Sequence, residues 1–178
     1  MTTAHPVLSE FQKICHQNYT CYVLAAGGVN SFVKDIAKGP PATMVFLSEQ
    51  DPTVATPTAR ITMGELRTLG GPDGKFTDVL AKAMLVSLYS EWDEYFRFKF
   101  AEAIGVSKNS VRSNIIGDLR LIRNCIVHSQ SIVANEHQRL LALSWPKHSG
   151  HLRITLPMMT ELFSKLNALE ITVVRTEA

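Results

Sequence analysis

Residues 78–104 read DVLAKAMLVSLYSEWDEYFRFKFAEAI, and their pattern sets the expected fold class. At 100° per residue, the large apolar side chains gather on one side of a helix and most polar ones on the other. The apolar side comprises Leu85, Leu88, Tyr89, Trp92, Phe96 and Ala103. The glycine that follows, Gly105, is a typical C-terminal stop. The stretch therefore predicts one long helix, with Trp92, Tyr95 and the neighbouring phenylalanines in the core.

A second helix is expected directly after the first. Ser107 or Asn109 can act as its N-cap, and its periodicity continues to about Ser131. The expected core stripe is Ile115, Leu119, Ile122 and Ile126, and Arg120, Asn124 and His128 follow at i, i+4 and i+8 on the opposite side. A flank formed by Ile116, Arg123 and Val127 lies between these faces. Such an apolar flank packs against either another subunit or a third helix of the same chain.

The rest of the chain predicts shorter helices and one long connection. Residues 6–38 have helical spacing, with Gly27-Gly28 as the place where a break would fall. Residues 39–75 are rich in glycine, proline and threonine, which predicts an irregular connection with a short extended piece and a helical turn. The extended piece is expected at Met44–Leu47 and the turn near Met63–Leu69. Further along, a short helix is expected at Glu136–Leu143. Pro157 can open a final helix, which has Met158, Leu162, Phe163 and Leu166 on one side. The whole is predicted to be a single all-α domain over residues 1–178, with four to six helices of which two are long and central.

Composition and cysteine count favour a cytoplasmic globular protein. The chain has 178 residues, of which 46% are hydrophobic, and no apolar run is long enough for a transmembrane helix. The N-terminus lacks the pattern of a signal peptide. Three cysteines, Cys15, Cys21 and Cys125, are most simply explained as reduced thiols. Cys15, His16 and Cys21 do not have a recognised zinc spacing, so no metal or cofactor is expected.

The basic residues are unevenly distributed. The formal net charge is only +2, but residues 97–128 contain six lysines or arginines against two acidic residues. A local basic patch attracts phosphates even when the whole chain is nearly neutral. A solvated helix face would have the same composition, so both interpretations stay open.

The end of the second helix carries the strongest chemical signal, in the stretch Arg123-Asn124-Cys125-Ile126-Val127-His128. Arginine can bind phosphate oxygens with its bidentate guanidinium, and histidine can accept or donate a proton near neutral pH. Asn124 lies one turn before His128 and can orient the imidazole or bind phosphate. Asp93 lies one turn before Arg97 and could hold a basic side chain in place.

The spacing also poses a geometric difficulty. Five residues correspond to roughly 140° around an ideal helix, so one helix does not easily aim Arg123 and His128 at one atom. Arginine is long enough to curve round, and a symmetric dimer would bring a second pair close, so we expect a composite site built from two subunits. In other interpretations, His128 is a surface cation near a helix C-terminus, Arg123 is an ion-pair partner of Asp93 or Glu94, and Asp93–Arg97 is a plain surface pair.

These residues resemble a known family. Arg123-x4-His128 is similar to the Arg-x(4–6)-His signature of HEPN domains, and residues 118–128 resemble the third-helix segment of that family nearly throughout. Residues 92–97 match its aromatic-acid-x-aromatic-x-basic pattern, and residues 151–169 resemble its short extended piece and closing helix. The resemblance covers about residues 76–170, whereas residues 39–75 have no counterpart.

The resemblance implies a HEPN-like helical bundle that acts as a homodimeric, metal-independent endoribonuclease. The catalytic residues would be Arg123 and His128, with Asn124 as polar companion and Asp93, Arg97 and Arg120 as supporting residues. The implied partners are RNA, a second copy of the chain and a cognate antitoxin or regulatory protein, in a toxin–antitoxin or antiviral system. The sequence departs from the family at two positions: Ser129 replaces a frequent asparagine, and Gln130 replaces a tyrosine that is modified in some toxins.

Two alternatives to an enzyme stay open. The chain could be a catalytically inactive HEPN-like module that binds RNA or protein. It could also be an antitoxin-bound scaffold in which the motif is structural. The intact arginine and histidine favour the enzyme.

Overall fold

The computed structural model describes residues 5–47, 59–133, 139–145 and 150–174, and these are mostly helical. The α-helices are α1 (Pro6–Ile36), α2 (Met63–Gly70), α3 (Lys75–Glu91), α4 (Arg97–Ala103), α5 (Asn114–His128) and α6 (Leu156–Asn167). Short antiparallel pairs join β1 (Met44–Leu47) to β2 (Ala59–Thr62), β3 (Val111–Arg112) to β6 (Thr172–Val173), and β4 (Ile132–Val133) to β5 (Gly150–His151). The all-α prediction is confirmed. Among the described residues, no helix is long and apolar enough to cross a membrane.

The chain forms two compact units. The first comprises residues 1–22 and 81–178, and the second comprises residues 23–80. Helices α1 and α3 each contribute residues to both units. That residues 1–178 act as a single domain stays a prediction.

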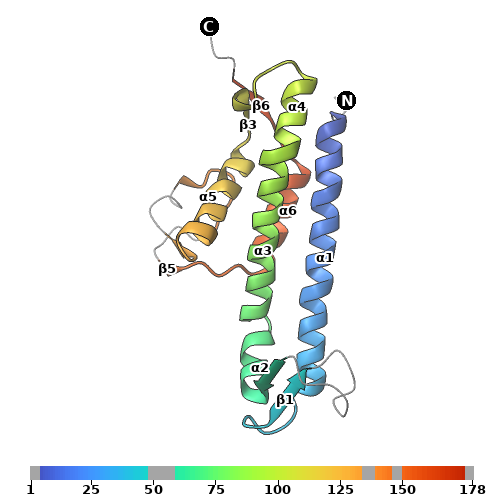
Figure 1. Ribbon diagram of the computed structural model, residues 1–178, viewed down its shortest axis with the longest axis vertical. Helices are drawn as coiled ribbons and strands as arrows, with labels where there is room; N and C mark the ends of the chain where they lie inside the picture. Colours follow the sequence, from blue (N-terminus) through green and yellow to red (C-terminus); the bar gives the residue numbers. More distant parts are fainter. Residues whose placement is uncertain (1–4, 48–58, 134–138, 146–149, 175–178) are drawn as a thin grey trace. The chain divides into compact units, whose positions relative to one another are not determined.

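Aromatic side chains build the core of the first unit. The ring of Phe11 in α1 lies 5.0 Å from that of Trp92 and 5.2 Å from that of Phe96. Tyr19 stacks on Phe163 of α6 at 4.6 Å. The N-terminal part of α1 therefore packs against both the long central helix and α6. Within this unit, the central helix lies between α1 and α5 (Figure 1).

The long helix predicted over residues 78–104 is present but contains a π-helical turn. α3 continues through η1 (Trp92–Phe96), which is π-helical, into α4. Trp92 and Phe96 are buried, but Tyr95 and Phe98 are exposed, so the expectation that all these aromatics lie in the core was wrong in part. Gly105 ends the helix as expected, with a φ of 69° and its N–H bonded to the carbonyl of Glu102 at 3.1 Å.

The predicted start of the second helix was wrong. Neither Ser107 nor Asn109 is its N-cap: residues 107–110 include a 3₁₀ turn, η2 (Lys108–Ser110), and α5 begins only after Ser113. The intervening β3 pairs with β6, which places Val111 opposite Val173. This pairing joins residues about sixty positions apart, so a local pattern could not show it. The core stripe is present, with Ile115, Leu119 and Ile122 buried and Ile126 half-buried.

The second unit is more ordered than the composition predicted. α1 continues through Gly27-Gly28 without a break, and the expected extended piece, β1, pairs with β2. Val33, Ala37 and Leu66 form its buried core. Thr62 and Glu65 form a capping box that starts α2. The hydrogen bonds from the backbone and hydroxyl of Thr62 lower the pKa of Glu65.

Two C-terminal expectations also needed correction. A short helix was expected at Glu136–Leu143. Its first three residues lie outside the described residues, and Leu140–Leu143 are not helical. Pro157 does lie in the first turn of α6, but the buried methionine of that helix is Met159 rather than Met158.

Asp118 links α5 to residues 141–143. Its carboxylate is 1% exposed and accepts backbone N–H bonds from Leu141 at 2.9 Å, Ala142 at 2.7 Å and Leu143 at 2.9 Å. A buried carboxylate is tolerated where such donors replace its lost hydration. The interaction fixes residues 141–143 against α5.

Two glycines provide opposite tests of the second unit. Gly28→Ala adds a methyl group where no other atom lies within 4 Å, in the middle of α1, and should raise the free energy of unfolding by ~0.5–1 kcal/mol. Gly74→Ala should lower it by ~1–3 kcal/mol, because the new Cβ would collide with the carbonyl oxygens of Leu69 and Gly71. Urea denaturation of both variants measures the difference. Equal midpoints for the two variants would contradict this packing.

Asp118→Ala should lower the free energy of unfolding by ~3 kcal/mol or more, because three N–H groups lose their acceptor. Asp118→Asn retains one acceptor oxygen and should lose less. Urea denaturation measures both, and Asp35→Ala on the exposed face of α1 is the control for the removal of a carboxylate. If Asp118→Ala unfolds at the same urea concentration as the control, the anchoring role is wrong.

Candidate active site

The structure brings Arg123, Asn124 and His128 together at the end of α5. Nη1 of Arg123 lies 2.9 Å from Nε2 of His128 and 3.2 Å from Oδ1 of Asn124. Arg123 and His128 therefore meet on one helix, and the composite site expected from two subunits stays a prediction. The angle of roughly 140° describes where the side chains leave the helix, and the arginine side chain is long enough to span the difference.

The chain turns sharply after His128. The carbonyl of Cys125 accepts hydrogen bonds from the N–H groups of Ser129 at 3.2 Å and Ser131 at 2.9 Å. Gln130 and Ser131 have φ angles of 50° and 65°, a left-handed conformation that non-glycine residues rarely adopt. This turn ends the helix at His128 and leaves its side chain exposed.

The contact between Arg123 and His128 favours one tautomer of the imidazole. A guanidinium can only donate hydrogen bonds, so Nε2 of His128 is the acceptor in this contact. The tautomer that fits the contact carries its proton on Nδ1. Nη2 of Arg123 makes no hydrogen bond with the described residues, so the guanidinium keeps donors for another partner. Its Nε is buried and also lacks a partner among them.

Asp93 organises a second group of charges on η1 and α4. Its carboxylate lies 2.9 Å from Nη1 of Arg97, the predicted i, i+4 pair, and 3.2 Å from Nζ of Lys108. Partial burial opposes its ionisation, but the hydrogen bonds from Arg97 and Lys108 outweigh this effect and lower the pKa of Asp93. Arg97 also donates from Nε to the carbonyl of Val111 at 3.2 Å. Among the described residues, Asp93 therefore pairs with these cations and not with Arg123.

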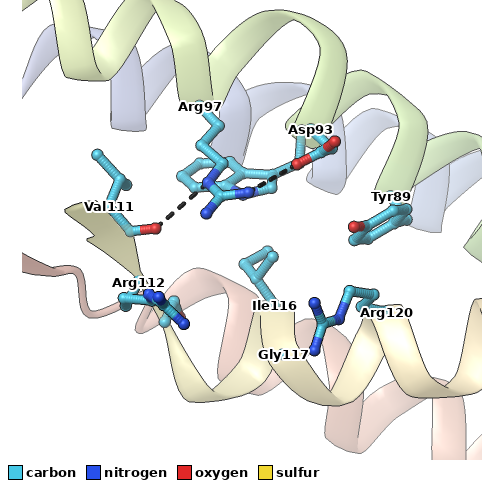
Figure 2. A pocket seen from close by; sticks show the side chains of 10 residues that line it. Tyr89, Asp93, Arg97, Val111, Arg112, Ile116, Gly117 and Arg120 are labelled. Atoms are coloured by element: carbon cyan, nitrogen blue, oxygen red, sulfur yellow. Dashed lines mark hydrogen bonds and ion pairs between the residues drawn. The ribbon is translucent and has the colours of Figure 1, made fainter. Parts of the chain in front are cut away.

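A pocket of about 90 Å³ lies between the central helix and α5 (Figure 2). It is lined by Tyr89, Trp92, Asp93, Arg97, Val111, Arg112, Ser113, Ile116, Gly117 and Arg120, and we call it the arginine pocket. In Figure 2, Arg97 lies between Asp93 and the carbonyl of Val111, and Tyr89 faces Arg120. Burial, followed by the charge of Asp93, raises the pKa of Tyr89 against the opposing effect of Arg120, Arg97 and Arg123, so its hydroxyl stays a donor at neutral pH.

Sequence reasoning found some of the pocket residues and missed others. It singled out Asp93, Arg97 and Arg120, all of which line the pocket. It placed Tyr89 in a core stripe and did not select Arg112. The only sequence signal for Arg112 was the basic excess of residues 97–128, which does not distinguish one arginine from another.

The cysteines do not suggest a metal site. Cys15 is fully buried, and burial, together with the charge of Glu91, raises the pKa of its thiol to about 12. Cys21 is exposed. In the described part of the chain, no group of three or more histidine, cysteine, aspartate or glutamate residues is arranged to hold a metal ion.

No family model, curated protein or solved structure matches this chain. A functional proposal must therefore depend on the chemistry of its own residues. The two groups that offer such chemistry are the Arg123–Asn124–His128 cluster and the arginine pocket.

The Arg123–His128 contact predicts a particular histidine tautomer. In the free protein, at a pH where the ring is neutral, His128 should carry its proton on Nδ1, and Arg123→Ala should shift it toward the Nε2-protonated form. The ¹⁵N chemical shifts of the ring measure this directly, with His128→Gln to assign the signals. Lys13→Ala, on the exposed face of α1, is the control and should change nothing. A protonated Nε2 in the unmodified protein would contradict the contact.

Proposed function

We propose that the chain is a metal-independent endoribonuclease of HEPN type. The observation that supports it best is the 2.9 Å contact between Arg123 and an exposed His128, with Asn124 beside them. The cluster joins a phosphate-binding cation to a proton-transfer group, the pair that RNA cleavage without metal requires. We also propose that the protein works in the cytoplasm, in a toxin–antitoxin or antiviral system in which a cognate protein restrains it.

The proposed reaction uses the ribose 2′-OH as nucleophile. His128 takes the 2′-OH proton, the 2′-oxygen forms a bond to phosphorus, and the bond from phosphorus to the 5′-oxygen breaks. The departing 5′-oxygen receives a proton, which gives a 2′,3′-cyclic phosphate and a 5′-hydroxyl. Arg123 stabilises the negative charge that accumulates on the non-bridging oxygens.

The resting contact suggests how substrate would start this reaction. Nε2 of His128 cannot take a proton while it accepts a hydrogen bond from Arg123. A phosphate diester offers Arg123 a charged acceptor, and such hydrogen bonds are about twice as strong as neutral ones. Arrival of the phosphate would draw the guanidinium away and release Nε2 as a base.

A homodimer would complete the site. While His128 of one copy takes the 2′-OH proton, the protonated form of the same histidine in a second copy can give a proton to the 5′-oxygen in the same step. Val127 and Ile132, on either side of the turn after His128, are 45% and 56% exposed. We propose that these side chains contact the second copy.

The enzyme proposal is tested by the products formed from mixed RNA in the presence of EDTA. The unmodified protein should produce 2′,3′-cyclic phosphate and 5′-hydroxyl ends, identified by mass spectrometry. His128→Ala should lower the rate by ~10²–10⁴-fold and Arg123→Ala by ~10²–10³-fold, because proton transfer and charge stabilisation are lost.

Lys13→Ala is the matched control, since it removes a cation from the exposed face of α1 and should leave the rate unchanged. Undiminished cleavage by both Arg123→Ala and His128→Ala would contradict the proposal. RNA binding without cleavage by the unmodified protein would instead identify an inactive binding module.

A further inference from the structure

The arginine pocket carries more positive charge than its own acidic group can balance. Asp93 is its only carboxylate, and this group already binds Arg97 and Lys108. Arg112 and Arg120 are both exposed, and neither makes an ion pair or hydrogen bond with the described residues. Unpaired arginines around a concave site are suited to an anion.

Gly117 adds open space to the arginine pocket. It lies inside α5, where glycine is less stable than alanine by ~1 kcal/mol. A Cβ atom added to Gly117 would have no other atom within 4 Å, so packing within the described residues does not require glycine there. Because Gly117 lines the pocket, its missing side chain leaves room for something to approach the helix backbone between Arg112 and Arg120.

We propose that the arginine pocket holds a backbone phosphate of the RNA strand that is bound at Arg123 and His128. This proposal rests on the nuclease function and extends it from the scissile phosphate to a neighbouring one. The pocket volume of about 90 Å³ leaves room for a phosphate group. Arginine forks and the protonated hydroxyl of Tyr89 supply donors from two sides of the pocket.

Helix α5 connects the two phosphate positions. Arg120 and His128 are eight residues apart on the same face, which is about 12 Å along the helix axis. Tyr89 is influenced by the charges of both Arg120 and Arg123, so the pocket and the cluster share one electrostatic field. A single strand that follows this face would meet the pocket first and the cluster near the end of the helix.

The test measures RNA binding separately from cleavage. His128→Ala serves as a background that should not cut, and fluorescence anisotropy follows binding of a 5′-labelled oligoribonucleotide at several salt concentrations. Arg112→Gln and Arg120→Gln should each weaken binding about tenfold and reduce the salt slope by roughly 0.7. Gly117→Leu should weaken binding similarly without any change of charge, because it fills the pocket, and should keep its helix content by circular dichroism.

Lys13→Gln is the control for loss of one charge outside the pocket and should alter neither affinity nor slope. If the three pocket variants bind like this control while Arg123→Ala binds weakly, the pocket proposal is overturned and the nuclease proposal stands. If the pocket variants lose affinity but the unmodified protein cuts no RNA, the pocket is supported and the nuclease is not. Binding of inorganic phosphate without any binding of the oligoribonucleotide would identify a free phosphate ligand and overturn the pocket proposal.

Discussion

The buried carboxylate of Asp118 is the interaction on which the rest of the site depends. The N–H groups of residues 141–143 surround it and replace its lost hydration, so it must face the interior. This requirement sets the rotation of α5 about its own axis, together with the burial of Leu119 and Ile122. Once that rotation is set, Arg120 and His128 lie on the exposed side of the helix. A polar anchor inside the core thus determines which residues a ligand can reach.

The sequence predicts the parts of this arrangement that depend on local periodicity. The central helix and the core stripe of α5 were predicted because each apolar residue repeats with the period of a helix. The start of α5 was not predicted, because it depends on the pairing of β3 with β6, about sixty residues further along the chain. Tyr89 has the spacing of a core residue, but it lies half-buried at the arginine pocket. Its exposure depends on the distance between two packed helices, which the spacing of one helix does not give.

The Arg123–His128 contact shows the same limit at the level of one side chain. A helical wheel places the two residues far apart because it considers only the direction in which each side chain leaves the backbone. The guanidinium lies several bonds from that point, and the helix ends at His128 with a left-handed turn that leaves the imidazole exposed. The relative position of two side chains at the end of a helix therefore depends on their rotamers and on the turn that ends the helix. The spacing of the residues specifies neither. The wheel alone therefore does not show the contact, and a catalytic role for Arg123 and His128 stays a prediction.

Several departures from ordinary helix chemistry occur in this one region. They are the π turn at η1, the glycine inside α5, two consecutive left-handed residues after His128, and a buried guanidinium Nε without a partner among the described residues. The glycine and the left-handed residues each carry a cost in backbone free energy. Departures of this kind persist when they serve a site, because a fold selected for stability alone would lose them. The second unit also contains such departures, since Gly27 and Gly28 lie inside α1 and Asp73 has a φ of 52°. What distinguishes the face of α5 is that its departures lie beside the arginine pocket and the Arg123–His128 contact.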